Sequence, residues 1–411
     1  MISHNKSRLY FVVAVYFGFW AALRLRRWRP LVVVVTGSNG KTTMLHMLES
    51  QLGKIATYSY KANSAFGIPF DILGLHRRSF SIGEWPLLLF LAPFKVLWPV
   101  PKQHIYIAET DCERPGEGKF LAHLLTPQIT IWLSLACTHS ASFDPLVDIQ
   151  FATVKEAIAY EFGWYLQHTQ KMVLVNSDDP LLMHQTGRTQ AEVRTVSMAD
   201  LHQYIVTTTH TSFTVDDETF DLPFFLPKET WYQLAAALAL TRYVKVEPDR
   251  SFKQLRLPPG RSNIFAGIHS TVLIDSSYNA NLASITAMLS AFSLLPAAHK
   301  WLVLGDLIEQ GNQEQEEYEA LAELITKVDA QRILLIGPRL AQYTLPILQR
   351  QNSSAIITAF NGPAEALLYS KAELVGNEVI LFKGARFLEG IIEQLLINPA
   401  DAALLYRREG V

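Results

Sequence analysis

The chain has 411 residues, of which 49% are hydrophobic and 18% are charged, and its formal net charge is −2. This length exceeds one ordinary hydrophobic core, so we expect two globular domains. The lack of a broad basic field argues against nucleic acid as a partner. The only cysteines, Cys112 and Cys137, form no disulfide framework or metal cluster and fit a reducing cytosol.

An uncharged stretch near the N-terminus, residues 9–23, is followed by Arg24, Arg26, Arg27 and Arg29. As a helix it would rise about 22 Å, which is short of the roughly 30 Å hydrocarbon core of a bilayer. We expect membrane association, because snorkelling arginines and interfacial aromatic side chains close this gap. The alternative is a helix packed on the protein itself. If the helix spans, its arginines keep the rest of the chain in the cytosol.

Residues 32–35 form a β-branched run that predicts a buried strand, and the glycine-rich turn T-G-S-N-G-K-T-T leads from it into a helix over residues 44–52. Backbone N–H groups of such a turn and the helix N-terminus bind phosphate. Lys41 supplies a cation for the β- and γ-phosphates, and Thr42 supplies a hydroxyl for Mg²⁺. Val35 replaces the first glycine of the general loop G-x-x-x-x-G-K-[ST]. The predicted nucleotide-binding residues are Gly37, Ser38, Asn39, Gly40, Lys41, Thr42 and Thr43.

A second apolar segment, residues 85–100, is interrupted by prolines and holds a single charge, Lys95. It either covers the core or forms a monotopic membrane patch beside the N-terminal helix. Both readings stay open at this point.

Further along the chain, strands alternate with helices, which is typical of an α/β fold with a mostly parallel sheet. Residues 204–225 predict a short antiparallel meander, and residues 226–244 a helix. The turn at residues 257–261 is the best domain boundary. The expected strands are 105–108, 129–135, 172–175, 272–275, 301–304, 333–336 and 378–382, and the later helices are 283–294, 314–325 and 387–397. We therefore predict a membrane-directed helix (1–30), a P-loop-type ATPase domain (31–260) and a smaller Rossmann-like α/β domain (261–411).

Several polar clusters follow the predicted strands. The run N-S-A-F-G-I-P begins at Asn63, and Glu109-Thr110-Asp111 closes a strand, where α/β sheets bind ligands. His139 closes the next strand, and Lys155 follows on a helix. In the second half, the runs are D-S-S-Y-N-A-N (275–281), G-D-L-I-E-Q-G (305–311) and K-G-A-R (383–386).

From about residue 31 to the C-terminus, these runs together resemble the Mur ligase family, the ATP-dependent amino-acid ligases of peptidoglycan synthesis. Within the family they are most similar to the branch that adds D-alanyl-D-alanine to a UDP-muramoyl tripeptide. The resemblance implies that an acceptor carboxylate attacks the γ-phosphate of ATP, and that an amine then displaces phosphate from the acyl phosphate. Phosphate clamps and divalent metal support such chemistry.

The resemblance also implies residue roles. Lys41 holds phosphate and Thr42 holds the first Mg²⁺. Glu109 completes this first metal site. His139 and a carbamylated Lys155 match the second metal site, since carbamylation creates an oxygen ligand for a hard metal. The catalytic set is Lys41, His139, Lys155 and Arg261, the last at the domain hinge. Nucleotide contacts in the second half are Arg261, Asp275 and Asn279, and substrate contacts are Asn63, Tyr278, Asn281, Lys383 and Arg386.

Some of these roles have a plainer alternative. Glu109 would end its strand in solvent, and His139 would be a structural histidine. Lys155 lies slightly further beyond His139 than the family pattern expects, so a solvated helix lysine is its alternative. Asn63 would be a turn former, and Arg386 would form a surface pair with Glu309.

Three departures from the family limit the resemblance. The domain that grips the UDP-sugar has no counterpart before residue 31. Glu229 and Gln233 replace a histidine and an asparagine at the start of the alanine-rich helix, and Asp111 replaces a glycine.

We expect a monomeric enzyme with a muropeptide acceptor and a dipeptide or amino-acid donor. We place it in the cytoplasm and attach it to the inner membrane through residues 9–23 and 85–100. One alternative is another ligase of the superfamily, of the folylpolyglutamate, cyanophycin or lipid-II-modifying type. The other is a nucleotide-binding scaffold with weakened catalysis at the cell-wall assembly site.

Overall fold

The structure, a computed structural model, describes residues 2–60, 62–77, 81–307, 311–351, 355–384 and 388–406. The chain divides into two compact units. The first comprises residues 1–198 and 232–248, and the second comprises residues 199–231 and 249–411. The Thr-rich meander therefore groups with the C-terminal residues, although it lies within the predicted ATPase domain in sequence. The domain boundaries at 30/31 and 260/261 stay predictions.

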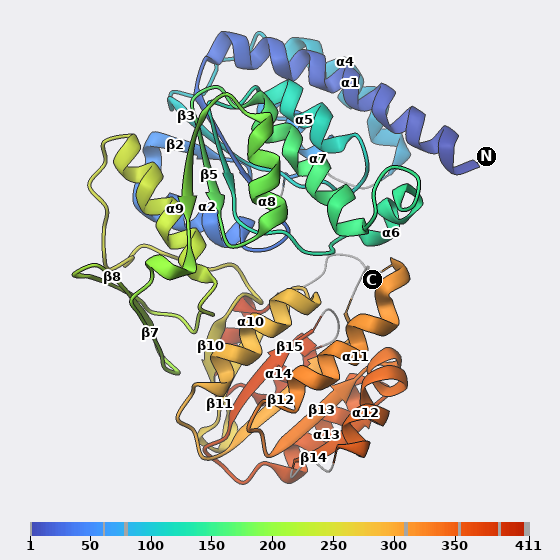
Figure 1. Cartoon of the computed structure of the whole chain (residues 1–411), viewed down its shortest axis with the longest axis vertical. Coiled ribbons are helices and arrows are strands. Elements are labelled where there is room, and N and C mark those ends of the chain that lie inside the picture. The colour runs from blue at the N-terminus through green and yellow to red at the C-terminus, as the bar shows by residue number, and fades with distance from the viewer. Residues whose placement is uncertain are drawn as a thin grey trace. The chain divides into compact units, whose positions relative to one another are not determined.

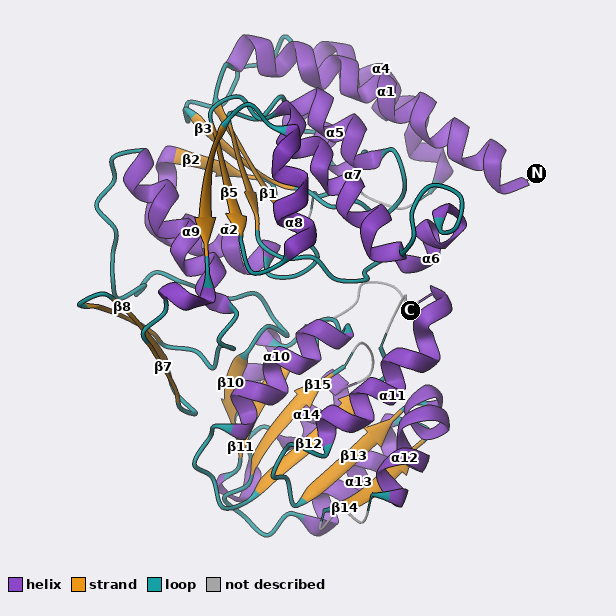
Figure 2. Cartoon of the chain, viewed as in Figure 1, coloured by secondary structure: helices purple, strands orange, loops and turns teal. Residues whose placement is uncertain are grey.

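The first unit is built on a parallel six-stranded sheet of order β2-β3-β1-β4-β5-β6, flanked by helices on both faces (Figures 1 and 2). Its strands are β1 (Leu31–Thr36), β2 (Ala56–Tyr58), β3 (Ile105–Glu109), β4 (Ile129–Trp132), β5 (Met172–Asn176) and β6 (Glu192–Val196). Because β1 is central, the loops after β1, β3 and β4 meet at one edge of the sheet. This edge brings together the phosphate loop, Glu109 and His139.

The helices of this unit are α1 (Ile2–Trp28), α2 (Lys41–Leu52), α3 (Gly67–Leu73), α4 (Trp85–Lys95), α5 (Glu117–Leu125), α6 (Ser140–Phe143), α7 (Val154–His168), α8 (Pro180–Gln185) and most of α9 (Thr230–Tyr243). Helix α7 begins at a capping box in which Thr153 and Glu156 exchange hydrogen bonds. Helix α1 is longer than the predicted 9–23 stretch and packs on the unit beside α3, α4 and α5.

The second unit holds a six-stranded sheet of order β10-β11-β15-β12-β13-β14, in which only β10 is antiparallel, and a three-stranded antiparallel sheet β7-β8-β9. Its strands are β7 (Gln203–Val206), β8 (Thr211–Val215), β9 (Glu218–Leu222), β10 (Asn263–Ala266), β11 (Val272–Ser276), β12 (Lys300–Gly305), β13 (Arg332–Ile336), β14 (Ile356–Phe360) and β15 (Val379–Lys383). Its helices are α10 (Leu282–Ser293), α11 (Glu314–Ile325), α12 (Leu345–Arg350), α13 (Pro363–Glu373) and α14 (Leu388–Leu395).

The predicted α/β architecture and the meander are therefore confirmed. The predictions omitted β2, β6, β10 and β14. Strand β6 shows why, because four of its five residues are exposed and it carries no apolar period.

Candidate active site

The phosphate loop joins β1 to α2 and is fixed against the segment that follows β4. The Ser38 hydroxyl donates to the Ala136 carbonyl at 3.0 Å, and the Asn39 amide donates to the Ser134 hydroxyl at 2.8 Å. Gly37 has a φ of 128°, and a Cβ there would lie 2.9 Å from the backbone of Ser134. Only glycine fits such a contact in this backbone conformation. The loop is thus held in one shape before any phosphate binds.

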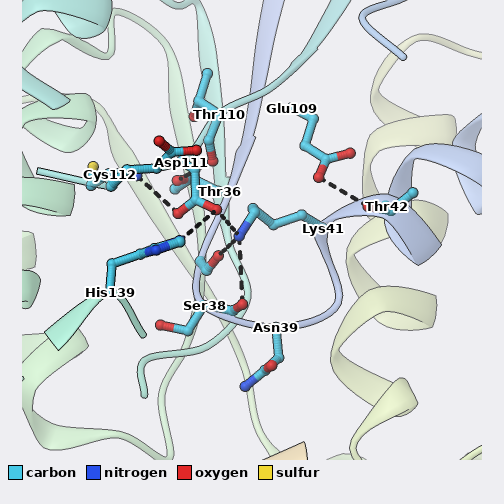
Figure 3. Close-up of polar contacts among 12 residues, drawn as sticks. Thr36, Ser38, Asn39, Lys41, Thr42, Glu109, Thr110, Asp111, Cys112 and His139 are labelled. Atoms are coloured by element: carbon cyan, nitrogen blue, oxygen red, sulfur yellow. Dashed lines mark hydrogen bonds and ion pairs between the residues drawn. The ribbon is translucent and has the colours of Figure 1, made fainter. Parts of the chain in front are cut away.

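Lys41, at the first position of α2, is buried against a carboxylate (Figure 3). Its Nζ lies 2.8 Å from Asp111 Oδ2 and donates to the Gly37 carbonyl at 2.5 Å. The ring of His139 points to the same carboxylate, with Nε2 4.0 Å from Asp111 Oδ2. The predicted phosphate lysine and metal histidine therefore share one partner. Sequence reasoning missed this role of Asp111, although the carboxylate two residues after Glu109 was its signal.

The predicted first metal site brings together Thr42 and Glu109. The Thr42 hydroxyl donates to Glu109 Oε1 at 2.9 Å, and Glu109 is 8% exposed at the end of β3. The Ser59 hydroxyl accepts a hydrogen bond from the Glu109 amide at 2.8 Å. Thr43 follows in the first turn of α2. The arrangement offers a hydroxyl and a carboxylate oxygen beside the phosphate loop, which is the oxygen chemistry that Mg²⁺ prefers.

The loop that carries Asn63 is anchored to the same edge of the sheet. The Asn63 carbonyl accepts a hydrogen bond from the Asp111 amide at 2.9 Å. Two residues on, the Ala65 amide donates to the buried Glu117 carboxylate at 2.7 Å, and Tyr10 of α1 donates to that carboxylate at 3.0 Å. Burial raises the pKa of Glu117. Asn63 is therefore placed close to Asp111, with its side chain partly exposed.

Lys155 stands on the first turn of α7 and pairs with a different residue. Its Nζ donates to Asp179 Oδ2 at 2.9 Å, while Asp179 Oδ1 accepts from the Leu181 amide and caps α8. Within the part of the chain that the structure describes, no group of three or more His, Cys, Asp or Glu residues could hold a metal ion. The second metal site of His139 and Lys155 stays a prediction.

In the second unit, the predicted residues cluster where β11 and β15 end side by side. Lys383, 5% exposed, donates from Nζ to the Asn279 carbonyl at 2.8 Å. Burial and the nearby Arg261 lower the pKa of Lys383 to about 7, against a smaller opposite effect of Asp275. Burial likewise raises the pKa of Asp275. Its Oδ1 accepts hydrogen bonds from Ser277, while Oδ2 has no partner among the described residues. A buried ammonium and a buried carboxyl are both biased toward their neutral forms.

The other residues of this cluster have distinct positions. The guanidinium of Arg261 lies 4.0 Å from the ring centroid of Tyr278, whose ring also meets Tyr406 edge to face. Asn281 caps α10, because its side chain accepts a hydrogen bond from the Ser284 amide at 2.8 Å. The cap gives Asn281 a structural function beside its predicted substrate role. Arg386 and Glu309 lie outside the described residues.

Two family models match the chain and together cover most of it. The one described as the Mur ligase middle domain matches residues 35–239, and the one described as the Mur ligase glutamate ligase domain matches residues 260–386. The chain belongs to the Mur ligase family.

Two similar proteins share an enzyme name. The UDP-N-acetylmuramoyl-tripeptide–D-alanyl-D-alanine ligase of Escherichia coli is 24% identical over 78% of this Mur ligase and 68% of its own length. The Bacillus subtilis ligase of that name is 22% identical over 90% of this chain and 76% of its own length.

The fold is shared with solved structures. MurF from Acinetobacter baumannii has a TM-score of 0.75 at 19% identity and covers 93% of this chain and 80% of its own. MurF from Thermotoga maritima, solved in complex with ADP, has a TM-score of 0.74 at 20% identity and covers 92% and 82%.

One departure from the family pattern gains a physical meaning in this Mur ligase. Gln233 on α9 reaches the phosphate loop, since a Cβ on Gly40 would lie 2.0 Å from its Nε2. Gln233 is also 7% exposed, and Gly40 has a φ of 85°. The side chain therefore packs directly against the turn that cradles phosphate. The side-chain amide of Gln233 thus lies against the loop at Gly40.

Proposed function

We propose that this Mur ligase is an ATP-dependent amide ligase of peptidoglycan precursor synthesis. It joins D-alanyl-D-alanine, or a similar amine, to a muropeptide carboxylate. The preformed phosphate loop beside the Thr42–Glu109 pair carries this proposal. Family membership and the enzyme name of the similar proteins support it.

The reaction has two steps. A carboxylate oxygen of the acceptor attacks the γ-phosphorus, and ADP leaves. The amine nitrogen of the donor then attacks the acyl carbon, loses a proton, and inorganic phosphate leaves. In the first step, Lys41 and the amides of the phosphate loop bind the phosphates and stabilise their developing charge. Bound phosphate would compete with Asp111 for the Lys41 ammonium.

The residues present fit a divalent cation. Thr42 and Glu109 would hold Mg²⁺, and His139 together with Lys155 in carbamylated form would hold a second one. Magnesium bound there neutralises charge on the triphosphate. The fit is better at the first site, because Thr42 and Glu109 already place two oxygen atoms together. At the second, the Lys155 ammonium is paired with Asp179 and would have to leave it.

We also propose that Arg261, Asp275 and Asn279 contact the nucleotide, and that Asn63, Tyr278, Asn281, Lys383 and Arg386 contact acceptor or donor. Lys383 supports its part in the proposal through its lowered pKa, because a neutral amine near pH 7 does not repel an incoming ammonium group. We place the monomeric protein in the cytoplasm, with a membrane-held acceptor.

The test is acceptor-dependent release of ADP. The full chain is incubated with ATP, Mg²⁺ and D-alanyl-D-alanine, with either a UDP-linked tripeptide or its lipid-linked form as acceptor. We expect ADP and a product heavier by one dipeptide, and we expect Lys41→Ala to abolish both. A preference for the lipid-linked acceptor supports the membrane-held substrate. Release of ADP with other amines only would identify a different ligase of the superfamily.

A second candidate function is a nucleotide-binding scaffold with weakened catalysis. The observation that favours it is the Lys41–Asp111 contact, which occupies the phosphate lysine. Retained ATP binding without ADP release for any muropeptide acceptor would support the scaffold and overturn the ligase.

A further inference from the structure

Helices α1 and α4 lie side by side on the outside of the first unit (Figure 1). The Tyr16 hydroxyl of α1 donates to the Leu89 carbonyl of α4 at 2.7 Å. Arg24 donates to the Lys95 carbonyl and, at 2.9 Å, to the Pro99 carbonyl, and Arg27 donates to the Trp98 carbonyl at 2.9 Å. These arginines bind carbonyl groups at and beyond the C-terminus of α4, where cations are favourable. These hydrogen bonds therefore hold α1 and α4 together.

The inner side of α1 is part of the hydrophobic core. Phe17 is fully buried, and its ring lies 4.7 Å from that of Phe70 and 6.1 Å from that of Trp85. Gly18 meets the ring of Phe120 so closely that a Cβ would lie 2.8 Å from it. By length and composition the segment 9–28 is a candidate membrane span, and 33% of it is buried. If α1 crossed a bilayer, it would lose these contacts with the core. The packing of α1 therefore does not fit a membrane-spanning helix.

The outer side of α1 is an exposed apolar stripe. Leu9, Val12, Val15 and Phe19 are each more than half exposed, and their spacing of three or four residues places them on one helix face. Large contiguous apolar patches are rare on monomeric soluble proteins, and they mark binding sites for proteins, membranes or ligands.

Helix α4, which packs beside α1, and the turn after it also expose apolar side chains. Phe90, Phe94, Leu97 and Trp98 are each half or more exposed. The inner residues of both helices belong to the same core cluster, so both outer sides point away from it. We name the combined set of eight outward residues on α1, α4 and the following turn the docking face.

Positive charge borders the docking face at one end. Arg26, Arg27, Arg29 and Lys102 are exposed there, and the Lys95 ammonium lies 3.6 Å from the ring centroid of Trp98. Residues 9–29 and 85–104 contain no Asp or Glu, although the whole chain has a net charge of −2. An apolar surface with tryptophan and arginine at its edge matches the interface of an anionic bilayer, where the rings and cations meet the headgroups.

We propose that the docking face seats this protein on the surface of an anionic membrane, with α1 and α4 lying in the interface rather than crossing it. The docking face lies outside the phosphate site, so the proposal goes beyond the ligase reaction and does not depend on it. In this proposal the membrane contact requires the folded first unit, because α1 and α4 are packed on it. A free N-terminal anchor would not require that fold.

The test is vesicle co-sedimentation of the full chain. We expect binding to phosphatidylcholine vesicles that contain phosphatidylglycerol, weaker binding to phosphatidylcholine alone, and release by high salt. Phe19→Asp and Phe90→Asp should each lower the partition coefficient about tenfold or more, since each removes the insertion of one aromatic side chain. Arg26→Gln with Arg29→Gln should lower binding to anionic vesicles only. Leu368→Asp, at an equally exposed leucine of the second unit, is the matched control and should bind normally.

Several outcomes would overturn the proposal. Absence of vesicle binding, or binding that Phe19→Asp and Phe90→Asp leave unchanged, removes the docking face as the cause. Retention of the protein in the bilayer after alkaline carbonate extraction indicates a spanning helix. A dimer that these two substitutions dissociate, with no binding to vesicles, assigns the face to a second copy of the chain. Circular dichroism and thermal melting confirm that each variant is folded.

Discussion

Replacement of Asp111 by asparagine should tighten nucleotide binding. Asp111 Oδ2 lies 2.8 Å from Lys41 Nζ, and both side chains are at most 10% exposed. A hydrogen bond to a charged group contributes about 1.5–3 kcal/mol, and we expect bound phosphate to compete with Asp111 for the Lys41 ammonium. Without the carboxylate, nucleotide dissociation constants should fall roughly tenfold to a hundredfold, because 1.4 kcal/mol corresponds to a factor of ten.

The same change should destabilise the nucleotide-free protein by up to about 3–5 kcal/mol, since it leaves a buried cation without its partner. The Gly37 carbonyl, 2.5 Å from Nζ, offsets part of this loss. Calorimetric titration with a non-hydrolysable ATP analogue, with and without Mg²⁺, measures the affinity. Asp111→Gly, which introduces the glycine of the family pattern, should also tighten nucleotide binding. Asp178→Asn, at an exposed aspartate, is the control and should leave the affinity unchanged. Weaker binding by Asp111→Asn, above all with Mg²⁺, would refute competition and indicate that Asp111 helps to bind the nucleotide.

Three further predictions concern packing and protonation. Gly37→Ala should abolish nucleotide binding and lower Tm, because its Cβ would lie 2.9 Å from the Ser134 backbone. Gly187→Ala, whose Cβ would meet no non-neighbouring atom of the described residues within 4 Å, should leave both unchanged in the same binding and melting assays. Phe17→Ala should lower the free energy of unfolding in urea by about 3–5 kcal/mol, whereas Phe19→Ala, at an exposed position, should change it by at most about 0.5 kcal/mol. Equal effects would contradict the burial of α1. Lys383 is protonated in the unfolded chain up to about pH 10, but loses its proton in the folded state near pH 7. Between these values the unfolded state binds more protons, so the Lys383 contribution to stability rises with pH by up to about 1.4 kcal/mol per unit. The advantage of Lys383→Met over the parent in urea unfolding should therefore shrink as pH rises from 7 to 10, and a constant difference would contradict the lowered pKa.

Local sequence patterns predicted the elements that carry the chemistry. The β-branched run and the turn after it yield β1, the phosphate loop and α2, because buried strands and glycine turns are encoded within a few residues. Strand β6 escaped prediction because most of its side chains are exposed. The grouping of the meander with the C-terminal unit could not be predicted, since it depends on packing between distant segments.

The site, like the fold, has features that local sequence patterns predict and features that depend on packing between distant segments. The resemblance to Mur ligases implied that Thr42 and Glu109 share one metal site, and the structure brings them together at the ends of the adjacent parallel strands β1 and β3. The contact of Asp111 with Lys41 depends on side-chain directions at that edge, which the sequence pattern does not encode. Similarly, Asp179 pairs with Lys155 from the start of α8, 24 residues away. An Asp directly before Pro180 was a signal for a helix cap, but not for an ion pair.

The position of α1 in the chain has a consequence for biosynthesis. Its inner side is covered by α3 and α5, which end at Leu73 and Leu125. At roughly 5–20 residues per second, the ribosome needs about 5–20 s to make the residues between Trp28 and Leu125. Until α5 has been made, the emerged part of α1 lacks the segments that cover its inner apolar side. Translation thus creates a period in which the emerging helix must be shielded from aggregation before the core can close over it.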